Sequence, residues 1–220
     1  MNKINNYINL IEQNLYKQAD LEYAKKANAY LLNQFKLMGV YTPKRKLAIK
    51  DVLQIQFDKE ELIELVNVLY HKEYRDFKYV AISLIKKNIK LFSSNDLPWI
   101  KNLIITEPWW ETVDSFAPIV GNIVKANQDP MDDWINDESF WIRRVAIIHQ
   151  LGWKSKTNKE LLCKYALQQS NEKEFFIKKA IGWAFRDYAR CNPNFVNNFM
   201  NDNKKNFSNL TFKEATKHIG

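Results

Sequence analysis

The sequence has few of the residues that build metal centres, disulfide frameworks or thiol-based active sites. Its two cysteines, Cys163 and Cys191, and its three histidines are scattered over 220 residues, without the short spacings that metal ligands share. We therefore expect no bound metal, no other cofactor and no Cys/His nucleophile.

Long apolar runs are also missing. No stretch of about 18 uncharged apolar residues is present. The N-terminal segment MNKINNYINLIEQNLYKQ lacks the continuous apolar stretch and the cleavage site of a signal peptide. We expect a cytoplasmic protein that has no contact with a membrane.

Glycine and proline are scarce, with five and six copies, and alternation of polar and apolar residues is rare. Apolar residues instead recur at i, i+3, i+4 and i+7, which predicts an all-α chain. The predicted helices span 3–17, 20–37, 43–56, 58–71, 74–91, 95–105, 108–125, 139–151, 158–169, 173–190 and 193–201. Asp20, Thr42, Asn95 and Asn192 are the predicted N-caps, two of them directly before a proline.

Four segments begin with an aromatic residue and resemble one another: FKYVAISLI, WETVDSFAP, WIRRVAIIH and FIKKAIGWA. Their first residues, Phe77, Trp110, Trp141 and Phe176, are 33, 31 and 35 residues apart. A helix pair repeated at this period is typical of an α-solenoid with a concave face. An irregular helical bundle is the alternative.

Positive charge is concentrated in one part of the chain. The formal net charge is +8, and residues 139–192 hold eleven Lys or Arg against four Asp or Glu, a surplus of seven. Residues 129–138 hold five acids and no base. A local basic surface is typical of proteins that bind nucleic acid.

The pair Trp109-Trp110 opens the segment WWETVD. Neighbouring residues of a helix are turned by roughly 100°, so the two rings cannot share a face. Trp109 falls with Val113 and Phe116 on the apolar stripe. Trp110 falls with Asp114 and then with the small residues Ala117 and Gly121, which predicts room for a bulky group. Packing of Trp110 on another helix, with Asp114 as a solvated charge, is the alternative.

The segment EFFIKKAIGWAFRDYAR places Trp183 opposite its apolar stripe, in line with Lys179, Arg186 and Arg190. An aromatic ring among cations suits a surface that meets phosphates and a sugar or base. Coverage of the ring by lysine and arginine stems, or packing on another repeat, would explain the same pattern.

Arg144 lies among apolar neighbours in FWIRRVAII, whereas Arg143 points elsewhere. A guanidinium in such surroundings needs an anion to offset its desolvation. That anion is either a phosphate or a carboxylate such as Asp114, and an inter-helix salt bridge is the structural alternative.

Four blocks of the chain resemble the AlkD-like DNA alkylation repair glycosylases, which are built from HEAT-like helical repeats. They are AYLLNQFKLMGVYTPKRK, WWETVDSFAPIVG, FWIRRVAIIHQLGWKSKTNKELL and EFFIKKAIGWAFRDYARCNP, in the family's order, from about residue 29 to the C-terminus. The resemblance implies one domain over residues 1–220 that hydrolyses the N-glycosidic bond of N3- and N7-alkylated purines in duplex DNA.

The resemblance also implies the site. The catalytic residues would be Asp114, Trp110, Trp183 and Arg144. The family's DNA contacts would correspond to Tyr30, Tyr41, Thr42 and Pro43. We also predict DNA contacts at Arg143 and at the stripe of Lys179, Arg186 and Arg190, which together with Arg144 would hold the phosphates that flank the lesion. We expect a monomeric, monofunctional enzyme of base excision repair that works without a base-flipping pocket. A non-catalytic HEAT-like module that binds damaged or branched DNA is the main alternative, and a solenoid that binds other proteins is a third.

Overall fold

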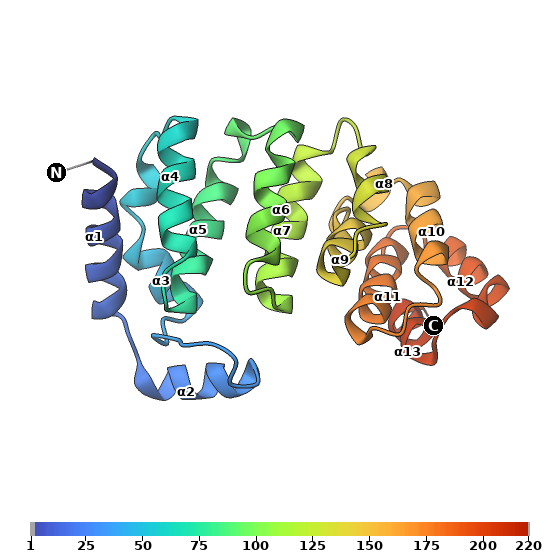
Figure 1. Ribbon diagram of the computed structural model, residues 1–220. Helices are drawn as coiled ribbons and strands as arrows, with labels where there is room; N and C mark the ends of the chain where they lie inside the picture. The colour runs from blue at the N-terminus through green and yellow to red at the C-terminus, as the bar shows by residue number, and fades with distance from the viewer. Residues whose placement is uncertain (1–2, 220) are drawn as a thin grey trace. The chain divides into compact units, whose positions relative to one another are not determined.

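The computed structural model describes residues 3–219, and this part of the chain consists of α-helices, short 3-10 turns and loops, with no β-strand (Figure 1). One isolated bridge joins Lys36 and Tyr74. The predicted all-α class is confirmed. None of the described helices is long and apolar enough to cross a membrane.

The chain divides into two compact units, Met1–Phe92 and Ser93–Gly220. The first unit contains α1 (Lys3–Lys17), α2 (Leu21–Tyr30), α3 (Thr42–Ala48), α4 (Lys59–Tyr70) and α5 (Arg75–Lys87). The second contains α6 (Leu97–Ile105), α7 (Trp110–Ile123), α8 (Pro130–Trp134), α9 (Phe140–Ile148), α10 (Lys159–Gln168), α11 (Phe175–Ala189), α12 (Pro193–Asp202) and α13 (Asn209–Thr216).

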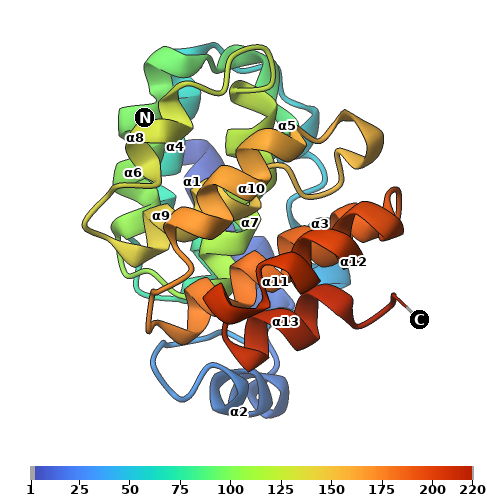
Figure 2. The same ribbon diagram turned by 90° about the vertical axis from the view of Figure 1, so that its right-hand side faces the viewer.

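Consecutive helices pack as pairs: α4 with α5 in the first unit, and α6 with α7, α8 with α9 and α10 with α11 in the second. The second helices α7, α9 and α11 also contact one another in order, and α12 and α13 lie against α11 (Figure 2). Each of the four aromatic residues of the sequence repeat lies within the first three residues of a second helix. The predicted repeat of helix pairs is therefore present.

Most predicted helices start and end within a few residues of the observed ones, but two are shorter. The helix predicted over 20–37 ends at Tyr30, because Leu32 and Asn33 adopt left-handed φ angles of 58° and 57°. The helix predicted over 43–56 ends at Ala48 and is followed by a 3-10 turn, Val52–Gln54. Helices α8 and α13 were not predicted.

Two of the predicted N-caps are confirmed. The side chain of Asp20 accepts a hydrogen bond from the Tyr23 amide, and that of Asn192 accepts one from the Phe195 amide. The other two predictions are wrong. Thr42 is the first residue of α3 rather than its cap, and Asn95 lies inside the 3-10 turn Ser94–Asp96.

Candidate active site

Arg144 and Asp114 form a bidentate ion pair between α9 and α7. Arg144 Nε donates to Asp114 Oδ1 at 2.7 Å and Nη2 donates to Oδ2 at 2.8 Å. The third nitrogen, Nη1, donates to the backbone carbonyl of Phe176 on α11. One guanidinium therefore ties together the three second helices of this unit, and each of its nitrogens has a protein acceptor.

The two partners differ in exposure. The Arg144 side chain is 1% exposed, whereas that of Asp114 is 22% exposed. The anion that Arg144 requires is thus the carboxylate of Asp114, which decides between the alternatives left open by the sequence. The Arg144 guanidinium is buried, and each of its nitrogens has a protein acceptor. A contact of Arg144 with a DNA phosphate stays a prediction.

Trp183 on α11 lies beside this ion pair. The guanidinium carbon of Arg144 is 5.2 Å from the centre of the Trp183 ring, within the range of a cation–π contact. Trp110 is the first residue of α7, one helical turn before Asp114, and is half-buried. The fold therefore brings Asp114, Arg144 and Trp183 together and places Trp110 on the same helix as the carboxylate.

The space predicted beyond Trp110 and Asp114 is not present. Ala117 is fully buried. At Gly121 an added Cβ would lie 2.0 Å from the carbonyl oxygen of His149, the C-cap of α9. Gly121 therefore accommodates the backbone at the C-terminal end of α9, whereas the Asp114 side chain is 22% exposed.

Trp109 has a different place from the one predicted. It is the N-cap of α7, in an extended conformation (φ −150°, ψ 160°), and not a residue of the helical apolar stripe. Its ring lies 5.5 Å from that of Phe176 and 6.0 Å from that of Trp141. Trp109 thus packs in an aromatic cluster at the N-terminal ends of α7, α9 and α11.

The predicted basic stripe on α11 is only partly available to a ligand. Lys179 Nζ and Arg186 Nη1 both donate to the carboxylate of Glu214 on α13, at 2.6 and 2.8 Å. Arg190 is the exposed C-cap of α11, and no ion pair within residues 3–219 includes it. Lys179 and Arg186 are thus paired with Glu214, and the contact of the stripe with phosphates stays a prediction.

Arg143, a predicted DNA contact, is also engaged within the protein. Its Nη1 donates to the carbonyl oxygens of Asp137 and Glu138, and its Nη2 donates to the carboxylate of Glu172. The side chain is 16% exposed. Arg143 therefore fixes the loop before α9, and its contact with DNA stays a prediction.

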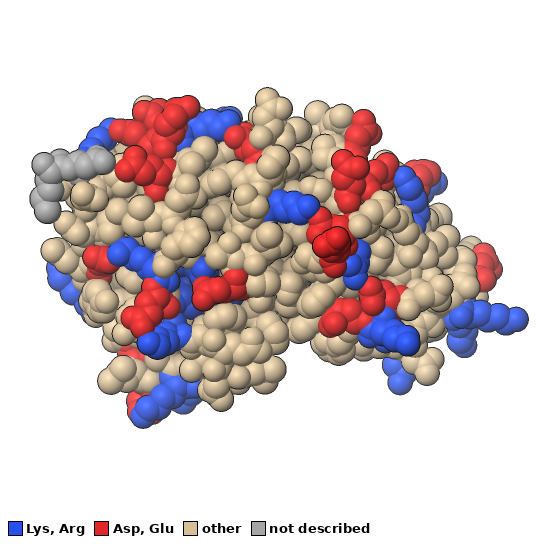
Figure 3. Space-filling model, viewed as in Figure 1, with Lys and Arg blue, Asp and Glu red and all other residues tan. Residues whose placement is uncertain are grey.

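Further ion pairs reduce the positive surface of this unit. Lys164 pairs with Asp132, and Lys101 pairs with Asp137, so the acidic segment 129–138 meets cations of neighbouring helices. On the face shown in Figure 3, Lys and Arg lie beside Asp and Glu at several places and form no single large basic patch.

Residues 11–219 match the model of a family described as DNA alkylation repair enzymes. The chain belongs to this family. No curated protein matches the chain significantly.

Solved structures agree with the DNA alkylation repair assignment. A predicted DNA alkylation repair enzyme from Enterococcus faecalis is 33% identical, with a TM-score of 0.85 over 92% of this chain and 97% of that one. AlkD2 from Streptococcus mutans is 18% identical, with a TM-score of 0.64 over 89% of this chain and 99% of that one. The second likeness concerns the fold alone, which is an array of HEAT-like helical repeats.

In this alkylation repair protein the remaining predicted DNA contacts belong to the first unit. Tyr30, the last residue of α2, is 71% exposed, and Tyr41, the N-cap of α3, is 37% exposed. Thr42 and Pro43 follow in the first turn of α3 and are also exposed. Their relation to DNA stays a prediction.

The loop that leads to Tyr41 is rigidly anchored. The buried carboxylate of Asp76 accepts hydrogen bonds from the amides of Met38 and Val40, at 2.7 and 3.0 Å. Gly39 between them has φ +81°, and an added Cβ there would lie 2.0 Å from the carbonyl oxygen of Asp20. Only glycine meets both requirements, so this loop presents Tyr41 in a defined position.

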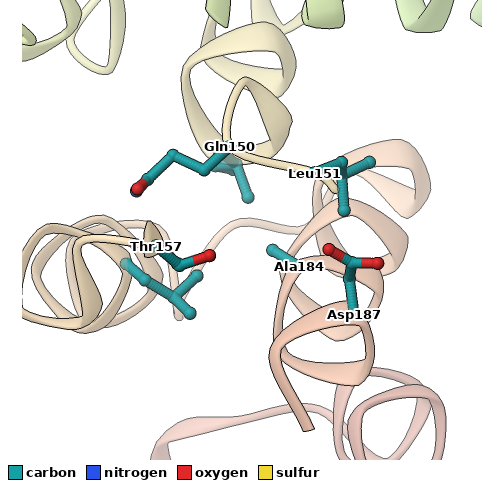
Figure 4. Close-up of a pocket in the computed structure, with 7 residues that line it drawn as sticks. Gln150, Leu151, Thr157, Ala184 and Asp187 are labelled. Atoms are coloured by element: carbon teal, nitrogen blue, oxygen red, sulfur yellow. The ribbon is translucent and has the colours of Figure 1, made fainter. Parts of the chain in front are cut away.

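Two surface hollows of the second unit lie outside the site. One has a volume of about 10 Å³, enough for a single water molecule. It is lined by Ile147, Gln150, Leu151, Thr157, Leu162, Ala184 and Asp187 (Figure 4). The other, of about 270 Å³, is formed by Lys125–Asp129 with Asp132, Asn158 and Leu161. Neither includes Trp110, Asp114, Arg144 or Trp183.

Sequence reasoning missed Glu214, which contacts three of the predicted site residues. The reason is that α13 was not recognised as a helix, although Ser208 caps it by accepting a hydrogen bond from the Thr211 amide. Ser208, a residue type that favours the N-cap, directly before NLTFKEAT was the available signal. No cluster of three His, Cys, Asp or Glu side chains that could hold a metal occurs within residues 3–219.

Proposed function

We propose that this member of the DNA alkylation repair enzyme family is a monofunctional DNA glycosylase. Its substrates are N3- and N7-alkylated purines in duplex DNA, and its product is the abasic site that begins base excision repair. The observation that carries the proposal is the Asp114 carboxylate, which Arg144 holds in a bidentate pair while its edge stays exposed.

The substrate chemistry requires only one acid. Alkylation at N3 or N7 makes the purine cationic, so the base leaves with little or no help from a general acid. As the bond to C1′ breaks, positive charge develops on the deoxyribose, as it does in glycoside hydrolysis. A fixed carboxylate stabilises this charge and can orient or deprotonate the attacking water.

Each neighbour of Asp114 has a distinct part in this proposal. Arg144 is a positioning residue, because it holds both carboxylate oxygens and is itself buried. Trp110 and Trp183 offer electron-rich faces to the sugar cation, each contributing roughly 0.5–2 kcal/mol. Bond cleavage with water as nucleophile yields the free base and an abasic sugar, and no lysine is needed to form a Schiff base.

We assign DNA binding to groups whose side chains are exposed. Arg190 is the exposed member of the α11 stripe, and Tyr30, Tyr41, Thr42 and Pro43 form the exposed edge of the first unit. In this proposal both units act as one domain on the same duplex, as a monomer in the bacterial cytoplasm. In this proposal the lesion is handled at the backbone, without a base-binding pocket.

Base release from methylated duplex DNA tests the proposal. The wild type is expected to release 7-methylguanine or 3-methyladenine and to leave intact strands with abasic sites. Asp114→Asn is expected to lower the single-turnover rate by roughly 100-fold or more while DNA binding persists. A wild-type rate equal to the rate without enzyme would refute the activity.

A non-catalytic module that binds damaged or branched DNA is the second candidate. The observation in its favour is the ion pair itself, because a bidentate Arg144–Asp114 pair also serves as a purely structural joint. This candidate predicts salt-sensitive DNA binding without base release. Measuring both quantities on one preparation separates the two candidates.

A further inference from the structure

Glu214 on α13 receives three hydrogen bonds from one face of α11. Its Oε1 accepts from Lys179 Nζ at 2.6 Å, and its Oε2 accepts from Arg186 Nη1 at 2.8 Å and from Trp183 Nε1 at 3.1 Å. The Glu214 side chain is 16% exposed. A single carboxylate thus binds the edge of the candidate active-site indole and the two cations on either side of it.

The backbone is shaped for this contact. An added Cβ at Gly182 would lie 2.5 Å from Glu214 Cβ and 3.0 Å from the carbonyl oxygen of Thr211. The Thr211 hydroxyl in turn donates to the carbonyl oxygen of Lys178, at 3.1 Å. Glycine at position 182 lets α13 approach α11 closely, so Glu214 is held by helix packing and not only by its own flexible side chain.

The surroundings keep the Glu214 carboxylate charged. The hydrogen bond from Lys179 lowers its pKa from the ordinary value most strongly, burial opposes this, and the charges of Lys179 and Arg186 add to the lowering. An indole N–H that donates to an anion leaves more electron density on its ring. The ring also has three cations near it, with Arg144, Lys179 and Arg186 at 5.2, 5.7 and 5.8 Å from its centre.

We propose that Glu214 is a positioning residue of the site. It fixes the indole of Trp183 beside the Asp114–Arg144 pair, and it engages Lys179 and Arg186 so that these cations hold Glu214 rather than a DNA phosphate. The inference rests on the proposed glycosylase function for its effect on rate. The part of the inference that concerns the position of the Trp183 indole is measured without DNA.

The experiment compares Glu214→Ala, Glu214→Gln and a control, Lys213→Gln, on the exposed neighbour in α13. The ¹H–¹⁵N indole signal of Trp183 is identified by its loss in Trp183→Phe. It is expected to shift clearly in Glu214→Ala, less in Glu214→Gln, which keeps an acceptor oxygen, and not in the control. The single-turnover rate at saturating DNA is expected to fall about 10-fold in Glu214→Ala and to recover to within about 3-fold in Glu214→Gln. Unchanged thermal midpoints show that the variants fold.

Salt titrations with undamaged duplex test the engagement of the cations. Arg186 and Arg190 lie on the same face of α11, and only Arg186 pairs with Glu214. Arg186→Met is expected to leave the dependence of log K on log salt unchanged. Arg190→Met is expected to reduce the slope by about 0.9, the value of one phosphate contact.

Two results would overturn the inference. One is an indole signal and a single-turnover rate in Glu214→Ala that match the wild type, which would make Glu214 a surface charge. The other is a salt slope reduced by about 0.9 in Arg186→Met, which would show that a phosphate displaces the carboxylate. If the wild type releases no base, the proposed function is refuted. The indole signal and the salt slopes then still decide the role of Glu214.

Discussion

Removing the charge of Asp114 tests the ion pair most directly, because its two partners differ in access to water. Asp114→Asn leaves a guanidinium that is 1% exposed without its anion. Breaking a buried pair in this way costs about 3–5 kcal/mol of the free energy of unfolding. That is a large share of the roughly 5–15 kcal/mol that typical domains have.

The reverse change is expected to cost less. In Arg144→Met the Asp114 carboxylate, 22% exposed, can be hydrated, and the loss concerns mainly the donor to the Phe176 carbonyl. We expect about 1–3 kcal/mol for this variant. The double variant has neither charge and should be about as stable as Arg144→Met alone, so the coupling in the cycle should equal the cost of Asp114→Asn, about 3–5 kcal/mol.

Urea unfolding measures these free energies, with equal m-values as the test that the variants are comparable. Glu22→Gln is the control, since Glu22 and its partner Lys25 are 76% and 74% exposed and the change should be within about 0.5 kcal/mol. An unfolding midpoint of Asp114→Asn equal to that of the wild type, or additive effects in the cycle, would refute the reasoning. The double variant is also useful in the base-release assay. If it is folded but inactive, its loss of activity is due to the missing Asp114 carboxylate and not to unfolding.

Two more perturbations test the packing around the site. Burial lowers the pKa of His149 from 6.5 to about 4, and the hydrogen bond to the Ala146 carbonyl partly opposes this lowering. On acidification the imidazole is therefore protonated at a higher pH in the unfolded chain than in the folded one. The wild type should therefore lose about 2 kcal/mol of unfolding free energy between pH 7 and pH 5 through this group. His149→Gln should remove that loss, whereas His71→Gln at an exposed position should keep it; equal pH profiles for all three would contradict the assignment. Gly121→Ala should destabilise by about 2 kcal/mol or more, because the new Cβ meets the His149 carbonyl at 2.0 Å, although alanine by itself favours a helix. Asn122→Ala, at the exposed neighbouring position, is the control variant in the same urea denaturation. A Gly121→Ala variant more stable than the wild type would show that α7 and the end of α9 can move apart at little cost.

Much of the fold follows from local patterns. Apolar periodicity located most helices to within a few residues, and the aromatic repeat located the second helix of each pair. The shorter elements were harder to predict, since α8 and α13 have only five and eight residues and offer little periodicity. Trp109 was placed on the helical stripe because periodicity cannot show where a helix begins, and its extended φ and ψ put it outside α7.

The sequence by itself determined the placement of Trp110 and Asp114 one turn apart and that of Trp183 opposite the apolar stripe of α11, because helical geometry relates residues three and four apart. It also predicted that Arg144 needs an anion. Only the tertiary structure decided which anion, and it placed Glu214 between the two cations of the stripe. Contacts between residues about 30 apart, such as Arg144–Asp114 and Trp183–Glu214, depend on how helices pack, which no local spacing encodes. The same packing filled the space beside Gly121 with the backbone at the C-terminal end of α9 and left the Asp114 side chain 22% exposed.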